Sequence, residues 1–441
     1  MTSKRDLLKR PGVNLVYTGT KRVKGIDTGT PAIVVAVTKK HTRETLSTLG
    51  LELIPAEIQS LPTDVVEGGP FKVGPDIESK ATPIDDPREH QKKFRPTVPG
   101  GVSAIVCGSS ACTTTCWVPS KKLNRPVLLH NWHCSYLSAC NDMKTVQPSP
   151  YDGGFHPQDD ISTVTAGDID TPTTDSAIDI PLDNTYATKL IFGLGEYAGY
   201  TTPNIGDPLV KSGRTTGITK GSCTATDGAA NVQYPDKIRL KTDLIVTTDM
   251  LAGGDSSSPL MIGNVDNGAA VIIDKRLAGQ GFAGGGGMSL FVKISNILTD
   301  PAIAPYELDF EGETPVSPQL FLTPTTLVPG QQFTYTVNGT FGGHAFELHL
   351  LDSARNLVTY LDRDVTPADS YTRTLTFPAT VEYSGQGYVQ FVDVEAFEGS
   401  NLVSVTVMKQ STCNVGNGTA RVLNGIASLF GRHGRFKYLV S

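Results

Sequence analysis

One short segment, Gly254-Asp255-Ser256-Ser257-Ser258-Pro259, has the residue types that a hydrolase needs around a nucleophile. Gly254 lets the backbone turn, so that its own N–H and that of Ser256 can point at one developing oxyanion. The small residues that follow leave room for a substrate carbonyl. A serine hydroxyl alone is a weak nucleophile, so this interpretation requires a base and a residue that orients the base.

Candidates for the base and its orienting acid lie upstream of this serine. The run Val127-Leu128-Leu129 is typical of a buried strand, and it leads to a histidine at His133. Forty-two residues later, Asp175 opens a second short apolar run. The order His, Asp, Ser is one of several in which the same triad geometry recurs. We therefore expect His133, Asp175 and Ser256 to form a catalytic triad.

Two further strings extend the pattern into a family resemblance. They are Gln147-Pro148-Ser149-Pro150-Tyr151-Asp152-Gly153-Gly154 and Val210-Lys211-Ser212-Gly213-Arg214-Thr215-Thr216-Gly217-Ile218-Thr219. Together with the triad segments, they resemble the chymotrypsin-like (trypsin-like) serine peptidases of bacteria and phages, and the second string is similar to the VxKSGRTTGxT hairpin of the bacterial members. The resemblance covers roughly Arg95 to Leu298. It implies a mainly β fold, a chymotrypsin-like double β-barrel with the histidine and acid on the first barrel and the serine on the second.

The resemblance also implies a role for each residue of the site. His133 would act as general base and then general acid, Asp175 would hold its tautomer and stabilise the imidazolium, and Ser256 would attack. The N–H groups of Gly254 and Ser256 would form the oxyanion hole. Met250, six residues before the nucleophile, would form the floor of the specificity pocket. An uncharged floor argues against cleavage after Lys or Arg, because nothing would pair the buried cation.

Three residues complicate this assignment. His130 is a rival base three residues from His133, but it stands where the family has a serine. Asp179 is a rival acid, although it lies beyond the apolar pair that follows the family's triad aspartate. Ser257 stands where the family usually has glycine, directly after the nucleophile. If the backbone there needs a conformation that serine adopts less readily, the oxyanion hole would be set incorrectly.

The cysteines are concentrated near the predicted base. The chain has seven, at Cys107, Cys112, Cys116, Cys134, Cys140, Cys223 and Cys413. The resemblance implies a disulfide between Cys116 and Cys134, with Cys112 as the reserve partner. The alternative is a zinc site formed by Cys112, Cys116, His133 and Cys134, which would consume the catalytic base. We therefore expect neither a metal nor another cofactor.

Length and composition limit the class of protein. A chain of 441 residues suggests two or three domains, and 45 glycines with 29 prolines favour loop-rich β structure. A net charge of −6 offers no electrostatic footprint for nucleic acid. No apolar run reaches the length of a membrane span, and the basic N-terminus lacks the apolar stretch of a secretory signal. We expect an extracellular or virion-associated protein that leaves the cell by another route, or otherwise a cytoplasmic one.

Four parts are expected along the chain. Residues 1–95 form an N-terminal α+β accessory subdomain and linker, with strands at 13–18, 32–37 and 63–67 and short helices at 43–49 and 56–61. Residues 96–300 form the protease domain. Residues 310–410 show the alternation of an immunoglobulin-like β-sandwich. Residues 411–441 form a tail in which basic and apolar residues alternate.

Two functions fit these observations. The first is a serine endopeptidase that hydrolyses peptide bonds through an acyl-enzyme, with a C-terminal domain for binding or assembly. The alternative is a structural or interaction protein of a virion or surface assembly that retains the protease fold with little or no activity. Expected partners are a polypeptide substrate and, through the sandwich and tail, further copies of the chain or another protein.

Overall fold

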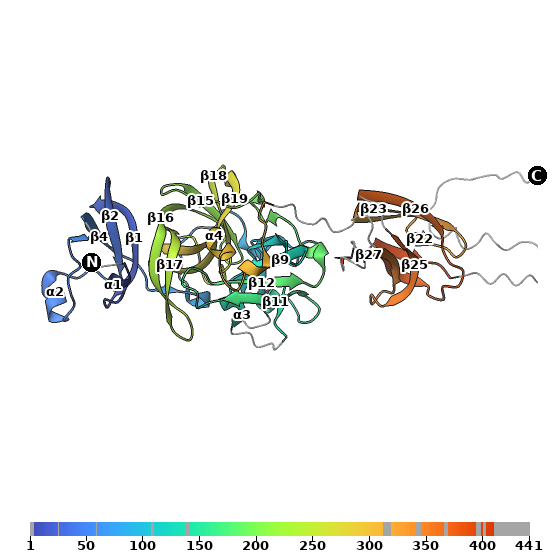
Figure 1. Ribbon diagram of the computed structural model, residues 1–441, viewed down its shortest axis with the longest axis horizontal. Coiled ribbons are helices and arrows are strands. Elements are labelled where there is room, and N and C mark those ends of the chain that lie inside the picture. Colours follow the sequence, from blue (N-terminus) through green and yellow to red (C-terminus); the bar gives the residue numbers. More distant parts are fainter. Residues whose placement is uncertain are drawn as a thin grey trace, which may run out of the picture.

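The chain forms three β-rich parts along its long axis (Figure 1). The computed structural model describes residues 4–24, 26–58, 60–106, 110–136, 142–311, 319–340, 345–365, 369–393, 398–399 and 403–409. The expected tail at 411–441 and the cysteines Cys107, Cys140 and Cys413 lie outside these ranges. The helices are α1 (Lys4–Leu8), α2 (Arg43–Thr48), α3 (His133–Tyr136) and α4 (Ile294–Leu298). In the described ranges, no helix combines the length and the apolar character that a membrane crossing requires.

A closed antiparallel barrel carries the predicted nucleophile. Its strands are β15 (Pro208–Gly213), β16 (Gly217–Gln233), β17 (Ile238–Thr248), β18 (Pro259–Asp266), β19 (Ala269–Gly285) and β20 (Met288–Lys293). They pair in the order β15-β18-β19-β20-β17-β16, and a β15–β16 pairing closes the ring. The Gly254 to Ser258 segment is the loop between β17 and β18, so closure of the barrel fixes both of its ends.

A seven-stranded antiparallel sheet carries the predicted base and acid. Its order is β7 (Cys112–Thr113), β6 (Ser103–Val106), β10 (Lys144–Val146), β11 (Asp160–Asp168), β12 (Ser176–Pro181), β9 (Arg125–His130) and β8 (Cys116–Ser120). β9 and β12 are neighbours, with Ala177 opposite His130 in the register. This pairing brings the end of β9, and with it His133, beside the start of β12, where Asp175 lies. The mainly β double-barrel architecture expected from the sequence is confirmed.

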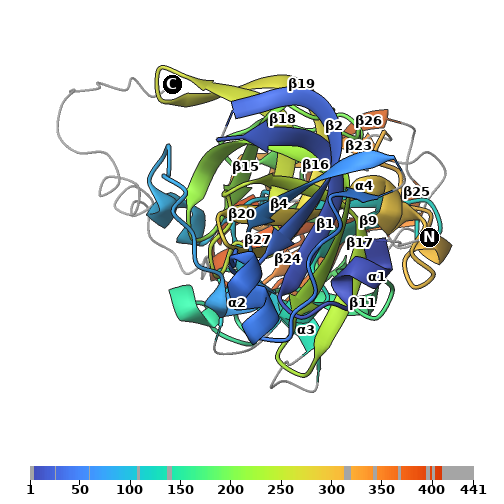
Figure 2. The same cartoon turned by 90° about the vertical axis from the view of Figure 1, so that its left-hand side faces the viewer.

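The N-terminal unit extends the second barrel's sheet. β1 (Val13–Val23) pairs with β16, and β2 (Ile26–Val37), β4 (Leu61–Glu67) and β3 (Glu57–Ile58) follow outward. Figure 2 shows β1, β2 and β4 with α1 and α2 on the side turned toward the viewer. The linker beyond them contains β5 (Phe71–Lys72).

The expected helix at 56–61 is wrong, because β3 and β4 form a tight hairpin there. Ile58 pairs with Leu61, and Ser60 between them has a positive φ of 64°. Ile58 is buried in the core beneath α1. A helix this short is marginal in water, and Pro62 could not donate a helical hydrogen bond. Burial of one apolar side chain therefore decides in favour of the hairpin.

The C-terminal part consists of two sheets that share one apolar core. One sheet has the order β21 (Gln319–Thr323), β23 (Gln332–Thr340) and β26 (Asp369–Thr376). The other has β22 (Thr326–Leu327), β29 (Val403–Val407), β27 (Gly385–Asp393), β24 (Ala345–Leu351) and β25 (Leu357–Val365), with β28 (Glu398–Gly399) beside β27. Buried aromatic and aliphatic side chains fill the shared core. The immunoglobulin-like assignment and the exact domain boundaries stay predictions.

Candidate active site

His133 and Asp175 form a buried hydrogen-bonded pair. His133 Nδ1 lies 2.7 Å from Asp175 Oδ2, and the His133 backbone N–H donates to Oδ1 at 3.0 Å. The hydroxyl of Tyr234 donates to Oδ2 at 2.9 Å, so the carboxylate accepts three hydrogen bonds. Two of these reach the same histidine through different atoms, and together they fix the orientation of its ring.

The charge of Asp175 is stabilised despite complete burial. Burial alone raises the pKa of a carboxyl group, but the charge of His133, its hydrogen bonds and the charge of Lys241 outweigh that effect and hold the Asp175 pKa below its ordinary value. An ionised Asp175 accepts a hydrogen bond from His133 Nδ1–H, and this tautomer leaves the lone pair on Nε2. This is the electrostatic arrangement that a general base requires.

The atoms that would exchange a proton in catalysis are buried and unpaired. His133 Nε2 and Ser256 Oγ both lack a hydrogen-bond partner within the described part of the chain, and Ser256 has no exposed surface. The two atoms therefore do not hydrogen-bond to each other, and the structure joins His133 to Asp175 but not to Ser256. Buried polar atoms normally find partners, so each of these two calls for an explanation.

The carbonyls of the nucleophile loop are held by two threonines of the first barrel. Thr113 donates from its hydroxyl to Gly254 O at 3.0 Å and from its backbone N–H to Ser256 O at 2.8 Å. Thr115 donates from its hydroxyl to Ser257 O at 2.7 Å. Among the described residues, none accepts a hydrogen bond from the N–H of Gly254 or Ser256. Both N–H groups therefore remain available to an oxyanion, although the oxyanion hole itself stays a prediction.

Ser257 adopts the backbone conformation for which glycine is usually needed. Its φ is +79°, which costs a non-glycine residue on the order of 1–3 kcal/mol. Its hydroxyl accepts the backbone N–H of Asn131 at 2.7 Å and donates to Asn131 Oδ1 at 3.2 Å. Asn131 Nδ2 in turn donates to Asp175 O at 2.7 Å. The serine is thus tied, through one asparagine, to the segment that carries the acid.

Asp255 anchors the nucleophile loop to the Gly213–Gly217 hairpin. Its carboxylate accepts the N–H groups of Thr215 (2.8 Å) and Thr216 (3.1 Å), the Thr216 hydroxyl (2.5 Å) and the N–H of Ala252 (3.0 Å). Lys211 Nζ lies 3.1 Å from the same carboxylate, and neither side chain of this ion pair has exposed surface. The hairpin string that carries the family resemblance is therefore the element that holds the residue before the nucleophile.

The string Gln147 to Gly154 contacts the same hairpin through Asp152. Arg214 donates to both carboxylate oxygens of Asp152, at 2.8 Å from Nε and with Nη2 on the other oxygen. The Arg214 guanidinium also lies over the Tyr151 ring, 4.9 Å from its centre. The two strings, about 60 residues apart in sequence, thus form one bidentate contact between the barrels.

His130 and Asp179, the rival base and acid, pair with each other. His130 Nε2 lies 2.6 Å from Asp179 Oδ1, and His130 Nδ1 lies 2.9 Å from Asn131 O. The hydroxyls of Thr145 and Ser162 donate to the other Asp179 oxygen at 2.5 Å and 2.8 Å. Both ring nitrogens of His130 face acceptors, an arrangement that favours the protonated ring and a structural role.

The His130 pair predicts a particular pH dependence of stability. Burial lowers the pKa of His130, but the charge of Asp179 and the hydrogen bonds outweigh it and raise the pKa above the ordinary value. The stabilisation is therefore complete below the unfolded pKa of about 6.5 and is lost as pH rises through the folded pKa. We expect the Tm difference between wild type and His130→Gln to be larger at pH 6 than at pH 9. A difference that grows with pH would contradict this sign.

The predicted Cys116–Cys134 disulfide is wrong, because Cys134 pairs with Cys112. Cys116 is a free thiol on β8, opposite Leu129 of β9, and it faces the main apolar core. Cys112 lies in a separate small cluster with Cys134 and Ile105. The alternation of side chains along a strand points Cys116 away from the loop after His133. The disulfide also removes two of the thiolates that the zinc alternative required.

One cluster of metal-ligand side chains lies apart from the triad. His156 Nδ1 is 3.0 Å from Asp160 Oδ1, and its Nε2 is 3.5 Å from Asp142 Oδ2. The two carboxylates therefore face opposite nitrogens of the ring. A metal ion binds one ring nitrogen, so this geometry fits an ion-paired histidine better than a chelating site.

Met250 is fully buried among core side chains of the second barrel. A Cβ placed on Gly221 would lie 2.6 Å from its sulfur, so the thioether packs against that strand. Leu251, the next residue, presents its carbonyl toward Gly284 of β19. The role of Met250 as a pocket floor stays a prediction.

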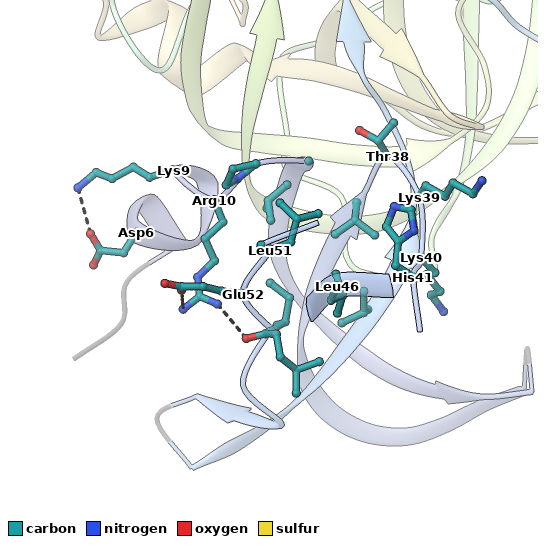
Figure 3. A pocket seen from close by; sticks show the side chains of 18 residues that line it. Asp6, Lys9, Arg10, Thr38, Lys39, Lys40, His41, Leu46, Leu51 and Glu52 are labelled. Carbon is teal, nitrogen blue, oxygen red and sulfur yellow. Dashed lines mark hydrogen bonds and ion pairs between the residues drawn. The ribbon is translucent and has the colours of Figure 1, made fainter. Parts of the chain in front are cut away.

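A hollow of about 880 Å³ lies in the N-terminal unit, away from the triad (Figure 3). Its rim carries basic side chains, two of which are already paired: Lys9 with Asp6 at 3.2 Å and Arg10 with Glu52 at 3.3 Å. None of the triad residues lines it. The volume is suited to a small ligand, but this hollow is separate from His133, Asp175 and Ser256.

Sequence reasoning missed the residues that support the triad. They are Thr113, Thr115, Asn131, Lys211 and Tyr234. Lys211 lies inside the quoted hairpin string and Asn131 lies between the apolar run 127–129 and His133, so both could have been found there. The threonines and Tyr234 carry no such signal, because each reaches the site from a segment more than fifty residues away in sequence.

The strand pairing defines the fold of the chain. A closed barrel with a Gly-Asp-Ser loop, beside a second sheet with a buried His–Asp pair, is the fold of the chymotrypsin-like serine proteases.

Comparison with known proteins finds similarity among solved structures. The sequence matches no protein-family model and no curated protein. Similar solved structures include the Cellulomonas bogoriensis chymotrypsin (20% identity, 46% of this chain and 94% of that chain, TM-score 0.33). Thermobifida fusca protease A is 19% identical over 46% and 95% of the two chains, with a TM-score of 0.34. The MamO protease domain of Magnetospirillum magneticum is 12% identical over 47% and 98%, with a TM-score of 0.31. The fold assignment itself rests on the strand pairing.

Proposed function

We propose that the chain is a serine endopeptidase that hydrolyses peptide bonds through an acyl-enzyme on Ser256. The observation that carries this proposal is the His133–Asp175 pair at 2.7 Å, with His133 Nε2 and Ser256 Oγ both buried and unpaired. Catalytic hydrogen bonds are often absent without substrate and form only in the substrate complex, so unpaired atoms of this chemistry support the proposal.

The mechanism follows from these positions. Ser256 Oγ attacks the scissile carbonyl carbon while His133 Nε2 takes the hydroxyl proton, and the carbonyl oxygen becomes an oxyanion facing the N–H groups of Gly254 and Ser256. The C–N bond then breaks, and His133 returns the proton to the leaving amine. Water attacks the resulting ester with His133 again as base, which releases the acid and restores Ser256. Asp175 stays ionised and stabilises the imidazolium throughout.

Labelling with a fluorophosphonate probe tests this proposal. We expect covalent labelling of the full chain at neutral pH, no labelling of Ser256→Ala, and strongly reduced labelling of His133→Ala. Intact-mass measurement would detect the adduct, and mass spectrometry of the peptides after digestion would locate it. Folded protein that stays unlabelled would contradict the proposal.

The alternative is a structural or interaction protein that keeps the fold. The complete burial of Ser256 and the strained φ of Ser257 favour it. Assembly would then depend on the C-terminal sandwich and the tail at 411–441. Size-exclusion chromatography with and without residues 411–441 tests this alternative, and a monomer in both cases would count against it.

A further inference from the structure

The linker between the N-terminal unit and the first barrel crosses the nucleophile loop. Among residues 74–83, Ile77 alone is buried, at 4% exposure, and both of its sequence neighbours are exposed. Its carbonyl accepts the N–H of Gly253 at 3.0 Å. A Cβ placed on Gly284 of β19 would lie 2.7 Å from Ile77 Cγ2, with the carbonyl of Leu251 at 3.5 Å from the same point. One apolar anchor in an exposed polar run indicates a side chain seated in a pocket.

The barrel makes room for the backbone of this linker with glycines. A Cβ on Gly253 would lie 2.4 Å from the carbonyl oxygen of Pro75, and a Cβ on Gly285 would lie 2.1 Å from that of Pro70. Either distance is too short for a side chain to exist there. The glycine-rich end of β19 and the start of the nucleophile loop are therefore shaped to receive a peptide backbone.

The linker also pairs with the barrel as a strand. Lys72 in β5 lies opposite Gly284 of β19 in antiparallel register, and β5 runs parallel to the end of β16 at Val232 and Gln233. The N–H of Val73 donates to Gln233 O at 3.2 Å. Adding an extended segment to a sheet edge is a general mode of peptide recognition, in which pockets for the side chains give specificity.

We propose that residues 74–77 occupy the substrate cleft as an internal ligand, with Ile77 in the side-chain pocket nearest the nucleophile and with Phe71 and Val73 fixed in the main apolar core before it. This inference rests on the proposed function and names its substrate: an extended peptide that places an aliphatic side chain between Leu251 and Gly284. Ile77 is held by Gly253, one residue before the expected oxyanion glycine Gly254. The linker must therefore withdraw before a substrate can bind.

Peptide binding to an inactive full-length chain tests this occupancy without any chemistry. The probe is a fluorescein-labelled peptide with the sequence of residues 69–77, followed by anisotropy against the Ser256→Ala protein and the Ser256→Ala/Ile77→Gly protein. Removing the isoleucine side chain weakens the internal competitor, so we expect the second protein to bind the probe about tenfold more tightly or better. A probe with aspartate in place of its terminal isoleucine should lose this binding.

Two further variants control for folding and for nonspecific effects. Ile205→Gly removes an isoleucine from an exposed position of the same barrel and should leave probe binding equal to that of the parent. Asp249→Asn loosens the far end of the linker, because Asp249 accepts hydrogen bonds from Ser79 at 2.9 Å and from the N–H of Lys80 at 2.6 Å. It should strengthen probe binding even if Ile77→Gly fails to fold. Equal binding by the parent and every folded linker variant would overturn the inference.

The same variants separate this inference from the proposed function. In the chain with Ser256 intact, Ile77→Gly should accelerate fluorophosphonate labelling about tenfold or more. If Ile77→Gly binds the peptide probe but remains unlabelled, the cleft assignment stands and the peptidase proposal fails. If labelling of wild type is already fast and is unchanged in Ile77→Gly, the peptidase proposal stands and the internal ligand is refuted.

Discussion

Asp175→Asn is expected to lower the rate of Ser256 acylation by about 10⁴-fold. The carboxylate of Asp175 accepts hydrogen bonds from His133 Nδ1 and from the Tyr234 hydroxyl on the same oxygen. An amide with its oxygen at the Oδ2 position turns its NH₂ group against the backbone N–H of His133, and the flipped amide turns its NH₂ group against His133 Nδ1 and the Tyr234 hydroxyl. With the NH₂ group toward His133, Nδ1 must become the acceptor and the ring proton moves to Nε2. Nε2 can then no longer take the serine proton.

The measurement is the second-order rate constant of fluorophosphonate labelling, with Tm as the check on folding. Asp179→Asn is the matched control, because it removes the same charge from a buried His–Asp pair on the same sheet. We expect Asp179→Asn to lower Tm while labelling stays within about threefold of wild type. A loss of less than tenfold in Asp175→Asn would show that the geometry of this pair does not serve a base.

Asp255→Ala is expected to destabilise the fold by about 3–5 kcal/mol, since it leaves the Lys211 ammonium buried without its counter-ion. Lys211 has no exposed surface, and burial already holds its pKa below the ordinary value despite the charge of Asp255. Its remaining partners are the Thr216 hydroxyl at 2.5 Å and Gly217 O at 2.9 Å. Neither can offset a full positive charge in a closed core.

Urea unfolding gives this free energy, and two variants make the result specific. Lys211→Met/Asp255→Asn removes both charges and should recover part of the loss, because no uncompensated ion remains. Lys92→Ala breaks the exposed Lys92–Glu89 pair and should leave the unfolding midpoint unchanged. Stability of Asp255→Ala within about 1 kcal/mol of wild type would mean that water or another group reaches Lys211.

Residue types and spacing predicted the core of the site. The Gly-Asp-Ser loop, a histidine after an apolar run and an acid before another are local patterns, and the double barrel brings their elements together. The rivals His130 and Asp179 were ranked lower only by the family resemblance, since each has the same chemistry as its neighbour. Their mutual pairing at 2.6 Å depends on the register of β9 against β12, which no single segment contains.

Other features depended on which face of a strand or loop turns inward. The sequence places Cys112 and Cys116 four residues apart, and the turn between β7 and β8 decides which of them reaches Cys134. Thr113 and Thr115 hold the carbonyls of the nucleophile loop from a distance of more than 140 residues in sequence. Contacts between residues so far apart in sequence depend on how the two barrels pack against each other, and local propensity does not determine them.

The sequence by itself determined the nucleophile motif, the candidate base and acid, and the mainly β architecture, because these are written in residue types at short spacing. The tertiary structure decided the disulfide partner, the support of Ser257 by Asn131 and the path of the linker. Most consequential is Ile77, an unremarkable residue in an exposed run of charge and proline. Its proposed role as an internal ligand depends on the glycines that the closed barrel places beside it, because the pocket forms only when strands distant in sequence pack together.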